Sequence, residues 1–301
     1  MNTTCNRSGA NDPAGKNPRA AFTLIEIMVV MALLSVIILG LVVMFNQTQK
    51  AFRAGMAQTD QLEGGRMFTD LLARDLQAIT PTYQTNTLNF YTQIPDYTPM
   101  RMTLPGSTAP RTNILQNLFF MTRLNQNWNG IGYFVRTNAW VGGNMNAVGT
   151  LYRFETNIPA YPFAGTTNLA YGAYLNATNP ANLSKILDGI VEFRVRCYDP
   201  NGLILTNGSG SIKSNYFVTV SNSFVIAPGE VGFYGFSNNI VPAFVELQVG
   251  VLEPAVLKRY RAIPDPVAQA NFLVNHAGNV QVFRQRVAIR NVDPSAYNSS
   301  P

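Results

Sequence analysis

The stretch Ile27–Phe45 reads IMVVMALLSVIILGLVVMF, and Ser35 is its only polar side chain. It is 19 residues long, and a helix that rises 1.5 Å per residue needs about 20 apolar residues to cross the hydrocarbon core of a bilayer. Lipid offers the backbone no hydrogen-bonding partners, so a segment that lies in it must be helical. The stretch therefore predicts a membrane helix, with everything after Phe45 on one side of the membrane.

An apolar run near an N-terminus can also be the core of a cleaved secretory signal peptide. Such a core is about 7–15 residues long and is followed by a small-x-small cleavage site. The present run is longer, and Asn46–Lys50, which follows it, reads NQTQK and contains no such site. We expect the run to be retained as an anchor.

The residues directly before the apolar run carry a more specific pattern. Ala21–Glu26 reads AFTLIE and follows a short basic tail. This pattern resembles the type III signal of type IV prepilins and type II secretion pseudopilins, which a prepilin peptidase cuts before a Phe and then methylates. The resemblance implies that residues 1–21 are a cytoplasmic leader, that cleavage falls between Ala21 and Phe22, and that Phe22 becomes N-methylated. Two departures are Ala21, where the family usually has Gly, and a long leader.

Glu26 is the fifth residue of the predicted mature chain. An acidic side chain in a membrane helix is costly, by about 2.5–3.5 kcal/mol at the bilayer centre on insertion scales, so it needs a cationic partner or a proton. No Lys or Arg lies within one helical turn of it in the sequence. The resemblance implies that Glu26 pairs with the α-amino group of Phe22 on a neighbouring subunit, which would couple processing to assembly. The alternative is a hydrated glutamate near a lipid headgroup, without such a role.

Helical periodicity continues beyond the membrane segment. Apolar residues recur at spacings of three and four, at Phe68, Leu71, Leu72, Leu76 and Ile79. Pro81 predicts the end of the helix, because the residue before a proline avoids the α region. We therefore expect one long helix over residues 22–80, with a transmembrane part at 22–45 and an amphipathic second half. Bending is expected at Gly55 and at Gly64–Gly65.

After Pro81 the sequence changes to short alternating segments separated by turns rich in Asn, Thr, Gly and Pro, which predicts half-buried antiparallel strands. The expected strands are 88–93, 118–123, 132–136, 151–155, 190–198, 216–220, 243–252 and 280–289, with a short helix at 266–275. Residues 81–293 thus predict a β-rich periplasmic domain, and residues 294–301 a flexible tail. The fold class expected is α+β and pilin-like, with the long helix packed on antiparallel sheet.

A narrower resemblance lies in three segments. The first is Met67–Leu76, which reads MFTDLLARDL, and the other two are the predicted strands Gly189–Tyr198 and Pro242–Leu247. All three resemble segments of J-type minor pseudopilins and W-type minor pilins. Residues 95–181 match no such pattern, and we expect them to be an insertion.

Composition gives little sign of an active site. The chain is 47% hydrophobic and 13% charged with a net charge of +6, and its basic residues after residue 50 are scattered. His276 is the only histidine and is expected to have a capping or surface role at the end of the short helix. Of the two cysteines, Cys5 lies in the leader and Cys197 in a predicted strand, where it is expected to be a buried apolar side chain. Because no metal-ligand spacing is present, we expect no cofactor, no metal and no enzymatic activity.

These features predict a single-pass protein of the inner membrane that later enters a filament. The function predicted is that of a minor pilin or pseudopilin that initiates or caps a type II secretion pseudopilus or a type IV pilus. Its expected partners are other subunits through the N-terminal helix, the prepilin peptidase, the inner-membrane assembly platform and the bilayer, but not nucleic acid. One alternative is an anchored ligand-binding or enzymatic ectodomain. Another is a DNA-uptake pilus subunit that uses Arg101, Arg111, Arg123 and Arg136 beside aromatic residues.

Overall fold

A computed structural model describes most of the chain. The described residues are 23–95, 101–106, 109–136, 148–159, 166–177, 183–206, 216–220 and 231–298. The predicted leader and the cleavage position between Ala21 and Phe22 lie outside them. The chain divides into two compact units, residues 1–54 and 55–301, and each is described by itself below.

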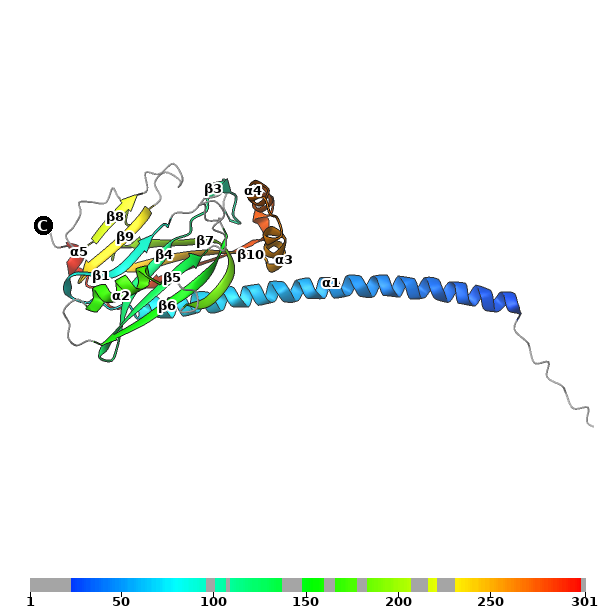
Figure 1. The fold of residues 1–301 in the computed structure, drawn as a ribbon, viewed down its shortest axis with the longest axis horizontal. Coiled ribbons are helices and arrows are strands. Elements are labelled where there is room, and N and C mark those ends of the chain that lie inside the picture. Colours follow the sequence, from blue (N-terminus) through cyan, green and yellow to red (C-terminus); the bar gives the residue numbers. More distant parts are fainter. Residues whose placement is uncertain are drawn as a thin grey trace, which may run out of the picture. The chain divides into compact units, whose positions relative to one another are not determined.

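The long helix predicted from the sequence is present. Helix α1 (Leu24–Gln77) is 54 residues long and ends four residues before Pro81 (Figure 1). It begins with the amide of Glu26 donating to the carbonyl of Thr23 at 3.0 Å. Residues 23–54 are the described part of the first unit, and the rest of α1, from Gly55, belongs to the second.

The second unit is built on one nine-stranded sheet in which all neighbouring strands are antiparallel (Figure 1). In spatial order its strands are β11 (Val280–Ala288), β10 (Phe244–Leu252), β7 (Ser184–Tyr198), β6 (Gly149–Pro159), β5 (Asn127–Arg136), β4 (Asn117–Leu124), β1 (Gln84–Gln93), β9 (Val231–Asn238) and β8 (Tyr216–Val220). Each predicted strand overlaps one of these, whereas β9 was not predicted. The predicted α+β class, a long helix packed on antiparallel sheet, is confirmed.

Smaller elements complete the second unit. They are the two-stranded sheet of β2 (Arg101–Met102) and β3 (Arg111–Thr112) and the helices α2 (Thr166–Leu175), α3 (Pro254–Arg261), α4 (Pro266–Asn275) and α5 (Ser295–Asn298). The predicted short helix at 266–275 is α4; Pro266 opens it, and the Asp265 carboxylate accepts a bond from the Ala268 amide at 2.8 Å. Helices α2 and α3 were not predicted.

The interpretation of residues 95–181 as an insertion is wrong. These residues contain β4, β5 and β6, which lie in the middle of the nine-stranded sheet. Ten residue pairs join β5 to β6, so the sheet could not exist without them. Strands at 118–123, 132–136 and 151–155 are predicted from local pattern, but their central place in the sheet is not, because it depends on pairing with strands far away in the chain.

One face of the sheet packs against the second half of α1. The predicted apolar stripe of the helix supplies Phe68, Leu72, Leu76 and Ile79, each at most 2% exposed. The ring of Phe68 lies 6.1 Å from the ring of Tyr133 on β5, edge to face. The helix thus forms one wall of the largest core, as the amphipathic pattern predicts.

The opposite face of the sheet carries an aromatic core under α2. Successive side chains of a strand point to opposite faces, so Phe134 belongs to this core while Tyr133 belongs to the other. Gly130 and Gly132 of β5 allow α2 to lie close to the strand: a Cβ on Gly130 would come 3.0 Å from the Ala170 Cβ, and one on Gly132 would overlap the Tyr174 ring. Small residues on β5 therefore position α2.

The end of the described chain differs from the expected flexible tail. Residues 294–298 contain α5, in which Ala296 and Tyr297 are buried. The Tyr297 hydroxyl donates to the carbonyl of Val241 at 2.7 Å. A buried aromatic ring with a satisfied hydroxyl fixes this segment on the domain.

Gly65 has a role that differs from the expected bending point. A Cβ at this position would overlap the ring of Phe283, a residue of β11. The absence of a side chain lets the aromatic ring reach the backbone of α1, and Gly65 is buried. Apart from the neighbouring turns of α1 itself, no described atom lies within 4 Å of the corresponding position on Gly55.

We expect Gly65→Leu to lower the free energy of unfolding by about 1–3 kcal/mol, because the Phe283 ring must move from a close-packed position. Gly55→Leu is the matched control, and it is expected to raise helix stability slightly because leucine is the better helix former. Denaturant unfolding of the two variants and the parent in detergent measures the difference. Equal stability of both variants would contradict the close contact at Gly65.

Candidate functional site on helix α1

The first part of α1 presents apolar side chains to its surroundings on every side. The large apolar residues from Leu24 to Phe45 are 48–75% exposed. By length and composition α1 could cross a membrane, and none of its apolar window is buried in the structure. A helix that is apolar all round needs an apolar environment, which is either lipid or other protein helices.

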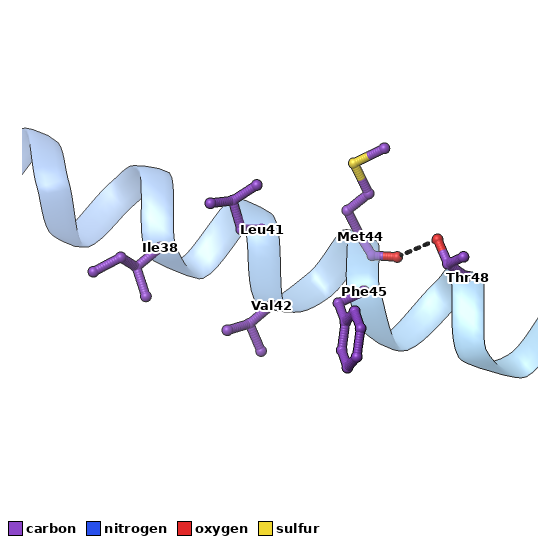
Figure 2. Close-up of a pocket in the computed structure, with 6 residues that line it drawn as sticks. All are labelled: Ile38, Leu41, Val42, Met44, Phe45 and Thr48. Carbon is purple, nitrogen blue, oxygen red and sulfur yellow. Dashed lines mark hydrogen bonds between the residues drawn. The ribbon is translucent and has the colours of Figure 1, made fainter.

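The polar side chains in this part of α1 do not break its apolar surface. The Ser35 hydroxyl donates to the Met31 carbonyl at 2.8 Å, and the Thr48 hydroxyl to the Met44 carbonyl at 2.9 Å (Figure 2). Both bonds lie within the helix itself, a common arrangement for Ser and Thr. Neither hydroxyl therefore needs water or another subunit as a partner.

Apolar side chains on two sides of α1 leave a shallow groove between them. Figure 2 shows Ile38, Val42 and Phe45 on one side and Leu41 and Met44 on the other. The groove is lined almost entirely by apolar surface. It could accept an apolar ridge from another helix or a lipid chain.

Glu26 is the one charged residue of the apolar segment. It lies in the first turn of α1, where the helix dipole favours a negative charge. Its side chain is exposed, and no cation among the described residues pairs with it. The other two predicted site residues, Ala21 and Phe22, lie outside the described part of the chain, so their part in processing stays a prediction.

Comparison with known families finds one match. Residues 16–42 match the family described as "Prokaryotic N-terminal methylation motif". The chain carries this motif. The matched residues include Ala21, Phe22 and Glu26 and continue into the apolar run. No curated protein and no solved structure matches the chain.

The motif and the structure together support the general prediction of a pilin-like protein with an N-terminal membrane anchor. A prepilin-type methylation signal followed directly by an apolar helix indicates membrane anchoring before assembly, and the motif implies processing by a prepilin peptidase. The helix packed on an antiparallel sheet gives the chain a pilin-like fold.

A charged contact fixes the second half of α1 to the sheet. Asp75 lies on the buried side of the helix, and its carboxylate accepts bonds from the Tyr133 hydroxyl at 2.6 Å and from Arg153 Nε at 2.8 Å. Arg153 also pairs with Glu155. Burial, and then the nearby Asp75 carboxylate, raise the pKa of the Tyr133 hydroxyl, so it remains a neutral donor. Sequence analysis missed this site, although an acid inside an apolar stripe is a signal for it.

Further polar contacts hold the helix at both ends of its packed segment. The Gln61 side-chain amide donates to the carbonyl of Val251 at 2.8 Å. The side-chain amide of Asn291 donates to the carbonyl of Ile79 at 2.8 Å. Ile79 lies just after the end of α1. The part of α1 from Gln61 onward is thus fixed to the domain by both apolar packing and hydrogen bonds.

The other residues considered for chemistry are engaged in the fold. Cys197 is fully buried in β7, and burial raises the pKa of its thiol. His276 follows the end of α4, where its Nδ1 lies 2.7 Å from the Phe272 carbonyl and its ring stacks on that of Phe272. The described residues contain no group of three or more His, Cys, Asp or Glu that could hold a metal ion.

The arginines of the DNA-uptake alternative divide into two groups. Arg123 lies over the ring of Trp128, and Arg136 over the ring of Phe134 while donating to the carbonyl of Ala177. These two guanidinium groups are held by their own domain. The side chains of Arg101 and Arg111 lie outside the described part of the structure.

We expect Asp75→Ala to lower the free energy of unfolding by about 2–4 kcal/mol, because it leaves Arg153 and the Tyr133 hydroxyl without their buried acceptor. Asp70→Ala is the matched control, since Asp70 is exposed on the same helix and its loss should change stability by at most about 0.5 kcal/mol. Chemical denaturation of the three proteins tests this. A loss that is the same for both variants would show that Asp75 contributes nothing beyond its charge on the helix.

Proposed function

We propose that this protein is a minor pilin or pseudopilin, a structural subunit that helps to initiate or cap a type II secretion pseudopilus or a type IV pilus. The observation that carries the proposal is the methylation motif at residues 16–42 directly on an apolar helix whose surface is unburied. The same helix continues into a β-rich domain to which its second half is firmly packed.

The proposed chemistry lies in the processing of the N-terminus. The prepilin peptidase hydrolyses the peptide bond between Ala21 and Phe22, which creates a new α-amino group on Phe22. Methylation of that amine keeps its positive charge at neutral pH. The amine of one subunit then pairs with the Glu26 carboxylate of its neighbour. This amine would be the cationic partner that Glu26 does not find among the described residues of its own chain.

The position in the filament is the finer part of the proposal. Residues Met67–Leu76 resemble the J-type minor pseudopilins and W-type minor pilins, and Asp75 of that segment joins the helix to the sheet. A subunit with this large domain suits the tip or the first assembled layer rather than the closely packed shaft. The partners proposed are neighbouring subunits through α1, the assembly platform and, before assembly, the bilayer.

We propose a structural role rather than an enzymatic one. The residues that would be expected to carry nucleophilic or acid–base chemistry, Cys197 and His276, are a buried thiol and a helix-end imidazole stacked on Phe272. A fully buried thiol and an imidazole bonded at a helix end are what a role in packing and capping would leave.

Intact-mass analysis tests the processing step. The chain purified from membranes of cells that contain a prepilin peptidase should begin at Phe22 and carry one added methyl group, because the motif places the scissile bond before this residue. The same chain from peptidase-deficient cells should retain residues 1–21 and provides the control. Retention of the leader in peptidase-positive cells would exclude the pilin assignment.

An assembly assay tests the role of Glu26. We expect Glu26→Gln to be processed normally but to enter filaments at least about tenfold less, the factor that corresponds to 1.4 kcal/mol for a lost ion pair. Glu63→Gln removes an exposed acid from the same helix outside the apolar segment and should assemble normally. Normal incorporation of Glu26→Gln would favour the interpretation of Glu26 as a hydrated interfacial residue.

A further inference from the structure

Strand β11 forms one edge of the nine-stranded sheet. It pairs with β10 over nine consecutive residue pairs, from Phe244↔Ala288 to Leu252↔Val280, without a bulge. On its other side, no strand among the described residues neighbours it in the sheet. A straight edge strand presents a row of backbone N–H and C=O groups that can pair with an additional strand.

The register identifies which backbone groups point outward. The Ile289 amide donates to the Ala243 carbonyl and the Glu253 amide to the Asn279 carbonyl, so the odd-numbered residues of β11 bond to β10. The even-numbered residues, among them Val282, Arg284 and Arg286, therefore turn their N–H and C=O groups away from β10. These groups make no backbone bond to any residue that the structure describes.

The only feature of β11 that opposes strand addition is its charge. Natural edge strands are commonly protected by proline, bulges or charged side chains, and β11, which reads VQVFRQRVA, has neither proline nor bulge. It carries Arg284 and Arg286, both exposed on the same face. An incoming strand would meet two positive charges two residues apart.

The strand beside these two arginines carries only one acidic side chain, Glu246. Arg286 lies over the rings of Tyr198 at 4.1 Å and Phe244 at 4.7 Å, which holds its guanidinium in place. Glu246 is its cross-strand neighbour, but that carboxylate also accepts a bond from the Tyr198 hydroxyl and pairs with Arg196 at 3.5 Å, so one acid is shared among several cations. Gln248, which is uncharged, lies opposite Arg284, and no carboxylate among the described residues forms an ion pair with Arg284.

The charges exclude this chain as the source of the added strand. In the best-overlapping antiparallel registers, two copies of β11 would place arginine opposite arginine, which is destabilising. No segment of the chain has two acidic residues at positions i and i+2, the spacing that would match the two arginines. The partner strand must therefore come from a different polypeptide.

We propose that the outer edge of β11 binds an extended segment of another protein that carries acidic side chains at alternate positions, as an added antiparallel or parallel strand. Backbone hydrogen bonds to the even-numbered residues would supply most of the affinity, and the two arginines would select the acidic sequence. The proposal rests on the sheet edge and does not depend on the filament function.

Hydrogen–deuterium exchange measured by mass spectrometry tests the proposal on the full chain in detergent. The probe is a short blocked peptide in which glutamate alternates with valine, and the control peptide has lysine in place of glutamate. The glutamate peptide should slow exchange in β11 at least tenfold and bind at least tenfold more tightly than the lysine peptide. The combined Arg284→Glu and Arg286→Glu variant should reverse this preference.

Two further variants separate backbone pairing from charge attraction. Arg284→Pro removes an N–H that makes no bond within the sheet, so the domain should fold normally and lose the peptide. Arg284→Thr removes the same charge but keeps the N–H, and should weaken binding only about two- to fivefold. Equal binding of both peptides, protection outside β11, absence of binding, or unchanged binding by a folded Arg284→Pro variant would each overturn the proposal.

Discussion

One helix has to meet two different environments along its length, and this constraint shapes the rest of the chain. Up to Phe45 the side chains of α1 are apolar on all sides, which suits lipid or other apolar helices. From Gln61 onward the same helix is amphipathic and packs one face on a sheet. The buried face of its second half is fixed to the domain by apolar packing and by hydrogen bonds.

That attachment combines apolar packing with a few specific contacts. Phe68, Leu72 and Leu76 supply the apolar wall, and Gly65 admits the Phe283 ring to the helix backbone. The Asp75 carboxylate then specifies the angular position of the helix, because only one orientation brings it to both Tyr133 and Arg153. Apolar contacts are tolerant of small rotations, whereas two hydrogen bonds to one carboxylate are directional.

The middle strands of the sheet are buried on both faces, whereas the edge strand β11 has no described strand beside it on one side. The face toward α1 and the aromatic face under α2 are both buried, so residues 95–181 form the middle of the domain rather than an addition to it. The edge at β11 carries a pair of arginines and backbone groups that bond to no described backbone group. A domain whose middle strands are covered on both faces can still offer an edge to another protein.

The sequence by itself determined the features that depend on local pattern: the anchor, the methylation motif, the amphipathic stripe, α4 and most of the strands. These follow from apolar length, periodicity of 3.6 or 2 residues and proline position, which act over a few neighbouring residues. The tertiary structure alone decided the order of the strands, the central place of β4 to β6, the contact of Gly65 with Phe283 and the partners of Asp75. Each of these joins residues far apart in the chain, for example Asp75 to Arg153, and no local pattern states which distant group a buried carboxylate will meet.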